Sequence, residues 1–255
     1  MKNSMQPHIR IGSGYDIEYA LLPGDPARVA EVAKFLDEVK EVAHNREFRT
    51  ILGSYKGVRV FVTSTGIGGA SAGIAVEELK KIGVKVMIRI GSCGALQKEI
   101  KIGELVIAAG AVRNDGASTA YIDSSYPAVA DSELLFQLME AAKRMGNSYH
   151  LGLVRSHDSF YTDEEQKIDT YWSSKGILAS DMETASLFVI GRLRGLKTAS
   201  LLNVVVEKEG DLEGGINDYL DKNNASKLGE SKEILTALEA IFSYHENRKN
   251  NKEVF

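Results

Sequence analysis

Arg89 interrupts an apolar run, residues 84–90, whose β-branched composition is typical of a buried central strand. A guanidinium that is removed from water is costly unless an anion meets it. The next residues, 91–94, have the composition of a turn. The backbone N–H groups of such a turn and the Ser92 hydroxyl can hold a small dianion. Because a guanidinium binds phosphate bidentately, the sequence predicts a phosphate site at this strand end.

A second arginine stands at the start of a predicted helix. In PGDPAR, Gly24 follows a strand, Asp25 is suited to cap the helix, Pro26 to open it, and Arg28 falls in the first turn. A helix N-terminus favours an anion, whereas an arginine there opposes the helix dipole. Two interpretations stay open on this motif alone, a solvated arginine and a phosphate ligand.

Two more turns stand at predicted strand ends. The glycine turn STGIGGAS (64–71) has neither the dinucleotide spacing nor the lysine of a P-loop, so a plain strand-to-helix turn is favoured. In ASDMETAS (179–186), Asp181 and Glu183 open a helix, where acids complement the helix dipole. Cys93 is expected to fill core space. No metal constellation is expected, because the histidines lack ligand spacing: His8, His44, His150, His157 and His245.

These turns need a sheet to bring them together, since ligands in open α/β sheets bind beyond the carboxyl ends of strands. Strands are predicted at 19–24, 84–90, 104–112, 150–156 and 197–207, and a hairpin at 48–55 and 58–65 around Lys56-Gly57. Helices are predicted at 26–36, 69–82, 131–145, 163–173, 182–194 and 226–244. The pattern predicts one α/β domain over residues 1–255, a three-layer α/β/α fold with a mixed sheet and a flexible tail at about 245–255.

The composition excludes several classes of partner. The chain has 255 residues, 44% of them hydrophobic, and a formal net charge of −4 with acids and bases interspersed, so neither nucleic acid nor a membrane is expected as a partner. A single cysteine rules out an intrachain disulfide and agrees with a reducing compartment. No signal-peptide core and no run of roughly 18 apolar residues is present, so a cytoplasmic, soluble protein is expected.

Nine segments in one order resemble the nucleoside phosphorylase family, which contains uridine phosphorylases and hexameric purine nucleoside phosphorylases. They are PGDPAR (23–28), HNREF (44–48), STGIGG (64–69), VEELKKIGV (76–84), RIGSCGA (89–95), VRNDGAS (112–118), PAVAD (127–131), DSFY (158–161) and DMETAS (181–186). In detail the resemblance is closest to uridine phosphorylases, and it extends from residue 8 to about 210.

The resemblance implies roles for the residues at the turns. Inorganic phosphate is the co-substrate, and its ligands would be Gly24, Arg28, Arg89, Ser92 and, from a neighbouring subunit, Arg46. The ribose would meet Met182, Glu183 and the neighbour's His8, and the base would stack on Phe160. Arg89 and Glu183 would carry catalysis. A monovalent cation such as K⁺ would lie at a dimer interface near Glu47, Ile67 and Ser71, and the assembly would be a hexamer built as a trimer of dimers.

The base pocket departs from the family pattern. Val206 stands where purine phosphorylases carry an aspartate that protonates the base, and Glu165 and Lys167 stand where uridine phosphorylases carry a glutamine and an arginine. Lys208 replaces a further arginine. Uridine is the expected substrate. The first alternative is a purine nucleoside or methylthioadenosine phosphorylase in which Glu165 or Glu207 acts as the acid. The second is a hydrolytic nucleosidase, against which the three phosphate-type arginines argue (Arg28, Arg46 and Arg89). The third is a non-catalytic nucleoside- or phosphate-binding module.

Overall fold

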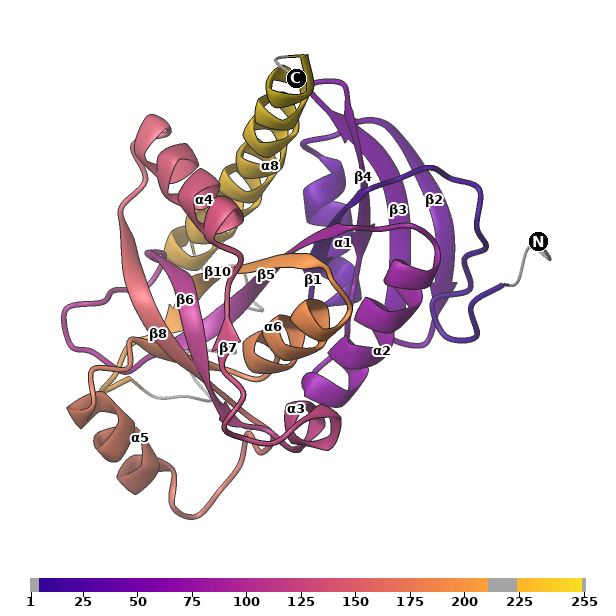
Figure 1. The fold of residues 1–255 in the computed structure, drawn as a ribbon. Helices are drawn as coiled ribbons and strands as arrows, with labels where there is room; N and C mark the ends of the chain where they lie inside the picture. The colour runs from indigo at the N-terminus through magenta and orange to yellow at the C-terminus, as the bar shows by residue number, and fades with distance from the viewer. Residues whose placement is uncertain (1–4, 211–223, 254–255) are drawn as a thin grey trace.

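The computed structural model describes residues 5–210 and 224–253, which form a mixed sheet between two layers of helices (Figure 1). The strands are β1 (Tyr19–Pro23), β2 (Asp37–Asn45), β3 (Phe48–Tyr55), β4 (Val58–Thr63), β5 (Val86–Ala95), β6 (Leu105–Asn114), β7 (Ala128–Val129), β8 (Tyr149–His157), β9 (Ala179–Asp181) and β10 (Lys197–Val206). The helices are α1 (Pro26–Ala33), α2 (Gly69–Lys81), α3 (Gly116–Tyr121), α4 (Ser132–Arg144), α5 (Glu165–Ser174), α6 (Thr184–Leu193) and α8 (Asn224–Glu253).

Strand β5 lies at the centre of the sheet. It pairs in parallel with β1 and with β10, and its last residues pair antiparallel with β9. From β10 the pairing continues through β6 and β8 to β9 and so back to β5, which closes five strands into a ring. On the other side, β1, β4, β3 and β2 extend as an open wing. The carboxyl ends of β1, β5 and β10 therefore lie at one edge of the sheet.

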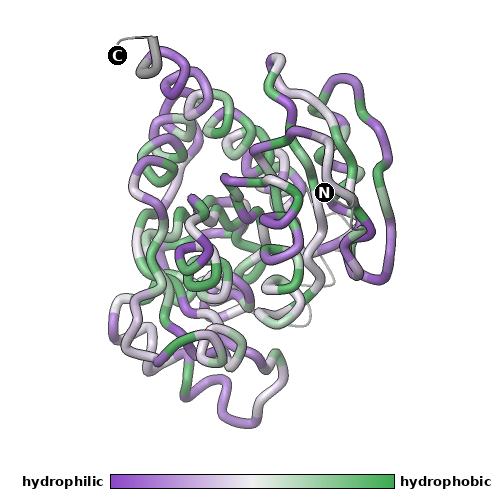
Figure 2. The backbone as a smooth tube through the Cα atoms, turned by 45° about the vertical axis from the view of Figure 1, so that its right-hand side comes forward, coloured by the Kyte–Doolittle hydropathy of each residue, from purple (hydrophilic) through white to green (hydrophobic). Residues whose placement is uncertain are grey.

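Alternating residues of each strand bury opposite faces of the sheet. Ala20 and Leu22 of β1 join the core beneath α2 and α6, whereas Tyr19 and Leu21 join the core beneath α1, α4 and α8. Figure 2 shows apolar segments concentrated toward the middle of the molecule and hydrophilic ones along its outer loops. Helix α5 has no fully buried residue. The predicted α/β fold with three layers and a mixed sheet is confirmed.

Most predicted elements are found within a few residues of their expected positions. The hairpin turns at Lys56 and Gly57, both with positive φ (49° and 80°), as a two-residue hairpin loop requires. Strand β2 is missing from the prediction, because its charged, largely exposed sequence hides an edge strand. The predicted turn at 91–94 is wrong: β5 continues to Ala95, because β10 pairs with these residues.

The last helix is longer than predicted. Helix α8 continues to Glu253 and covers most of the expected tail at 245–255. Arg248, in this part of the helix, lies 3.3 Å from the Glu18 carboxylate and stacks on the Tyr244 ring. Within the described residues, no helix is both long and apolar enough to cross a membrane.

Candidate active site

Arg89 meets two carboxylates inside the protein. Its Nε donates to Oδ2 of Asp181 at 3.0 Å, and its Nη2 lies 2.5 Å from Oε2 of Glu183. Asp181 ends β9, the strand that pairs with the last residues of β5, and Glu183 directly precedes α6. Nη1 has no hydrogen-bond partner among the described residues, and a Cβ placed on Gly24 would lie 4.0 Å from it. The free-energy cost of burying the Arg89 charge is thus offset by two carboxylates of the same chain, and one of its nitrogens is left near the end of β1.

Burial and charge act in opposite directions on the Arg89–Glu183 pair. Burial raises the pKa of Glu183, and the Arg89 charge opposes this rise. Burial lowers the pKa of Arg89, but Glu183 and Asp181 outweigh it, so the pKa is raised. Oε1 of Glu183 accepts from the Gly68 N–H at 2.6 Å, at the start of α2. The glycine turn therefore orients the carboxylate, a role that the sequence did not assign to it.

Asp181 accepts several hydrogen bonds and holds Arg89 in place. Its Oδ1 accepts from the Ser156 hydroxyl at 2.6 Å, and its Oδ2 accepts from the backbone N–H and the hydroxyl of Thr184 at 3.0 and 2.6 Å. The expected role of Asp181 as a helix-opening acid is therefore found, and the same carboxylate also positions a guanidinium.

Arg28 lies in the first turn of α1, where Asp25 caps the helix by accepting from the Ala27 N–H at 2.8 Å. Its side chain is buried, so the solvated interpretation is wrong. Nε lies 3.0 Å from Oε1 of Glu230, and Nη1 lies 3.9 Å from Oε2 of Glu233, both on α8. Nη1 of Arg28 also donates to the Ile90 carbonyl at 3.5 Å, so its guanidinium lies beside β5, one residue from Arg89.

Glu233 binds the backbone N–H of Gly91, one of the groups that the sequence assigned to an anion. Its Oε1 accepts from the Gly91 N–H at 2.6 Å, while Oε2 has no hydrogen-bond partner among the described residues. The side chain is 0% exposed, and burial raises its pKa to about 8, against the opposing charge of Arg28. Ser92 is half-buried on β5, opposite Asn203 of β10. Sequence reasoning missed Glu233, because nothing local marks a helix residue as the partner of a distant strand.

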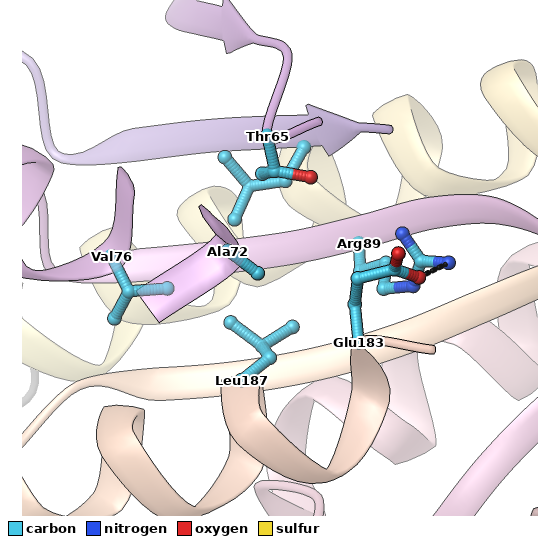
Figure 3. A pocket seen from close by; sticks show the side chains of 7 residues that line it. Thr65, Ala72, Val76, Arg89, Glu183 and Leu187 are labelled. Atoms are coloured by element: carbon cyan, nitrogen blue, oxygen red, sulfur yellow. Dashed lines mark ion pairs between the residues drawn. The ribbon is translucent and has the colours of Figure 1, made fainter. Parts of the chain in front are cut away.

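A small pocket opens beside the Arg89–Glu183 pair (Figure 3). The pair forms its polar end, and apolar side chains from α2 and α6 form its walls. The lining residues are Leu22, Thr65, Ala72, Val76, Arg89, Glu183 and Leu187. Met182 is half-buried between β9 and α6, next to Glu183.

The residues predicted to bind the base lie around the ends of β8 and β10. Phe160 is half-buried in the loop after β8, and its ring packs edge-on against Tyr161 with centroids 5.0 Å apart. Val206 is buried opposite Gly94 of β5. The Lys208 ammonium donates to the Ser173 hydroxyl at 2.6 Å, so it ties the end of β10 to α5.

Lys167 and Glu165 point in different directions. Lys167 is 83% exposed and pairs with Glu164 at 2.7 Å, so it faces solvent in this structure. Glu165 is half-buried, and burial raises the pKa of its carboxyl, with a further rise from Asp169. Arg155 of β8 is buried near both carboxylates and donates to Oδ1 of Asn114 at 3.0 Å. Sequence reasoning missed Arg155, although, like Arg89, it interrupts an apolar strand.

Other predicted residues lie away from this cluster. Arg46 is exposed at the tip of the β2–β3 turn with φ 56°. Nδ1 of His8 lies 2.7 Å from Oε1 of the buried Glu78, which also accepts from the His8 N–H. The Ser71 hydroxyl donates to Oε1 of Glu47 at 2.8 Å, and Ile67 beside them is 79% exposed.

Within the described residues no group of three or more His, Cys, Asp and Glu side chains is arranged to hold a metal. Cys93 is buried, as expected of a core residue, and burial raises its pKa well above the usual value for a thiol.

Known proteins resemble the chain over most of its length. The sequence profile of the Phosphorylase superfamily matches residues 18–237. The uridine phosphorylase of Thermococcus kodakarensis is 39% identical over 94% of this chain and 87% of its own. The guanosine phosphorylase of Halorubrum lacusprofundi is 39% identical over 86% and 89%. The crystal structure of a Vibrio fischeri uridine phosphorylase in complex with 6-hydroxy-1-naphthoic acid superimposes with a TM-score of 0.88, at 46% identity over 94% and 97%. With the profile matching more than half of its residues, this chain belongs to the phosphorylase superfamily.

Proposed function

We propose that the protein is a pentosyltransferase that uses inorganic phosphate to cleave the N-glycosidic bond of a nucleoside, releasing the base and ribose or deoxyribose 1-phosphate. One observation carries the proposal. Two buried arginines lie beside the carboxyl end of β1: Arg89 on the neighbouring strand β5, and Arg28, whose Nη1 donates to the Ile90 carbonyl at 3.5 Å. Next to Arg89 is a carboxylate, Glu183, that borders a pocket. The similarity to uridine and guanosine phosphorylases supports it.

Phosphate would bind between the two arginines and Gly24. Nη1 of Arg89 lies near Gly24 and has no hydrogen-bond partner within residues 5–210 and 224–253, so phosphate can bind there while Asp181 keeps its bond to Nε. Arg46 of a neighbouring subunit would add a third guanidinium, and the Ser92 hydroxyl a further donor. These groups position the nucleophile, and the fixed Asp181 contact keeps Arg89 from reorganising during the reaction.

The bound phosphate oxygen would attack C1′ as the glycosidic bond breaks, and the bonding electrons leave with the base. The transition state resembles an oxocarbenium ion, as in glycoside cleavage. Glu183, held by the Gly68 N–H, would accept from the ribose hydroxyls and stabilise the positive charge, while Met182 packs against the sugar. No protein nucleophile is needed.

Uridine is the substrate that we propose. Val206 can neither protonate nor hydrogen-bond a leaving purine. Glu207, the alternative acid, lies 3.1 Å from the Lys101 ammonium at the surface. The second candidate is guanosine, which the Halorubrum lacusprofundi relative favours.

We further propose that the sites are shared in an oligomer, a hexamer built as a trimer of dimers. Arg46 is exposed at a turn and can reach a neighbouring site, and His8 would contact the 5′-hydroxyl there. Glu47 and Ser71 lie together beside the exposed Ile67, an arrangement that fits one half of a monovalent-cation site at an interface. K⁺ would then be a structural ion with no part in the chemistry.

The proposal is tested by base release from a panel of nucleosides with and without phosphate. We expect release only with phosphate, and formation of a sugar 1-phosphate in equal amount. Arg89→Ala should abolish it, whereas Lys143→Ala, which removes an exposed ammonium on α4, should retain it. Equal release in phosphate-free buffer would identify a hydrolase, and binding of nucleoside with no turnover would identify a binding module.

A further inference from the structure

Three buried polar atoms near β8 and α5 lack a hydrogen-bond partner in the part of the chain that the structure describes. They are Nη1 of Arg155, Oε2 of Glu165 and Oδ1 of Asp169. Buried polar groups are nearly always paired, because an unpaired one keeps the full cost of losing water. Three such atoms in one cluster, one donor and two acceptors, indicate that a partner from outside the chain completes them.

The three side chains interact but do not satisfy one another. Glu165 and Asp169 are four residues apart on α5, so they share one face of the helix. Both carboxylates act on the charge of Arg155, yet neither forms an ion pair with it in the described structure. Burial lowers the pKa of Arg155 and raises those of Glu165 and Asp169. The arginine is only 6% exposed, so it is withdrawn from water without a full set of partners.

The cluster adjoins the active site through β8. Ser156, the residue after Arg155, donates to Asp181, which holds Arg89. The half-buried Phe160, the residue expected to stack on the base, lies in the loop that joins β8 to α5. The chain thus runs from Arg155 past the ribose side of the site and past the aromatic ring before it reaches Glu165. Side chains two residues apart on a strand share a face, so His157 lies on the same face of β8 as Arg155. Besides burial, the charges of Arg155, Asp169 and Asp181 all act on the pKa of His157, so this face carries the unpaired atoms next to the site.

The donor and acceptor pattern defines a class of base. A guanidinium N–H beside a carboxylate matches a carbonyl oxygen next to a ring N–H, which is the edge of uracil, hypoxanthine and guanine. Cytosine presents the reverse pattern, an amino group next to a bare ring nitrogen, and would place donor against donor and acceptor against acceptor. Guanine adds an amino group, for which the second carboxylate is an acceptor.

We infer that Arg155 and Glu165 read the carbonyl and N–H edge of the base, and that Asp169 orients Arg155. This inference rests on the proposed function. It assigns to Arg155 the part that the sequence had given to Lys167, whose ammonium faces solvent. It also gives Glu165 an acceptor's role toward a ring N–H, so its carboxylate need not face a carbonyl oxygen.

The decisive experiment compares uridine with pyrimidin-2-one riboside, which lacks the 4-oxygen and, because N3 becomes an imine nitrogen, also lacks the N3–H. In Arg155→Met we expect kcat/KM for uridine to fall about 100-fold, the usual effect of losing a hydrogen bond to a charged group, and that for the analogue to fall less than about threefold. Arg155→Lys should recover part of the loss, and the KM for phosphate should stay unchanged. Lys143→Met, which removes an exposed ammonium on α4 that pairs with Glu140, is the control and should behave as wild type. If guanosine proves the better substrate, 2-aminopurine riboside replaces the analogue.

A second variant decides the matter even where Arg155→Met does not fold. Glu165→Gln keeps one acceptor and adds an N–H, so it should lower the ratio of uridine to cytidine kcat/KM at least about tenfold. Equal losses on uridine and the analogue in Arg155→Met, or an unchanged uridine to cytidine ratio in Glu165→Gln, would overturn the inference and leave the cluster as an anchor for α5. A wild-type enzyme that releases no base from any nucleoside would instead overturn the proposed function.

Discussion

At the scale of residues, the site carries more negative than positive charge. Two guanidiniums, Arg28 and Arg89, face four carboxylates, and the four are Asp181, Glu183, Glu230 and Glu233. A phosphate dianion would be repelled by such a group if every carboxyl were ionised. Glu233 resolves part of this conflict, because its pKa of about 8 keeps it protonated at neutral pH.

Glu233 makes stability depend on pH. In the unfolded chain its pKa is the ordinary 4.5, so between pH 4.5 and about 8 the folded protein holds a proton that the unfolded protein has lost. This contribution to stability is full below pH 4.5 and is lost as the pH rises through about 8. The free energy of unfolding should fall by up to about 1.4 kcal/mol per pH unit in this window from this group alone.

Glu233→Gln should flatten this dependence, because an amide keeps the bond from the Gly91 N–H and does not titrate. Urea unfolding at pH 5.5, 7 and 8.5 measures the effect. Glu230→Gln, which removes another carboxylate from the same arginine, controls for loss of charge. Parallel curves for wild type and Glu233→Gln would show that Glu233 does not hold the proton.

At the scale of elements, the contact between α2 and α6 sets the position of Glu183. The start of α2 lies so close to α6 that a Cβ on Gly69 would come 2.2 Å from the Ser186 hydroxyl, which is itself held by Asp115 at 2.5 Å. The neighbouring Gly68 N–H binds Glu183. Close packing of two helices and orientation of a functional carboxylate thus depend on the same glycine turn.

Gly69→Ala should push α2 away from α6. We expect a loss of about 1–3 kcal/mol in the free energy of unfolding, the usual cost of overpacking, and a higher KM for the nucleoside because Glu183 loses its backbone donor. Gly73→Ala, one turn further along α2, is the matched control. Its Cβ would meet only the mobile tip of the Ile190 side chain at 2.9 Å, and alanine favours a helix by about 1 kcal/mol over glycine. Equal effects of the two changes on stability and KM would contradict this account.

At the scale of the whole molecule, a single chain holds an incomplete set of the phosphate ligands that we propose. Arg28 and Arg89 are buried near the end of β1, whereas Arg46 is exposed at the far turn of the β2–β3 hairpin. The wing of β1, β4, β3 and β2 carries this turn out of the five-stranded ring. A second copy that contributes Arg46 would complete the site.

Mixing two inactive variants tests this sharing. Arg46→Ala and Arg89→Ala should each lose phosphorolysis when expressed alone. When the two variants are co-expressed and pair at random, half of the dimers contain one subunit of each kind. Each mixed dimer then has one intact site and one inactive site. We expect recovery of about a quarter of wild-type activity, because the sites of a two-fold dimer are built by both subunits. Recovery should fail if Arg46 acts within its own chain, and sedimentation of a fully active monomer would exclude sharing altogether.

Much of the fold was accessible from the sequence because it depends on neighbouring residues. The Lys56-Gly57 turn, the Asp25 cap of α1 and the apolar periodicity of α2 and α4 are local patterns, and the structure has each of them. An arginine in an apolar strand was also a readable sign, and Arg89 is buried at the site as expected. The sequence did not predict three strands: the edge strand β2, the two-residue β7 and the three-residue β9. These strands form because neighbouring strands pair with them, and no local pattern marks that.

The sequence by itself determined which residue types stand at the ends of the strands, and through the order of its motifs it determined the family. Only the tertiary structure decided which charges meet. Glu230 and Glu233 are about 200 residues from Arg28, and Asp181 is 92 residues from Arg89. The solvent exposure of Lys167 and the burial of Arg155 likewise depend on where α5 lies relative to the sheet. Such pairings depend on how the apolar faces of sheet and helices pack together, and no local period of a sequence records that packing.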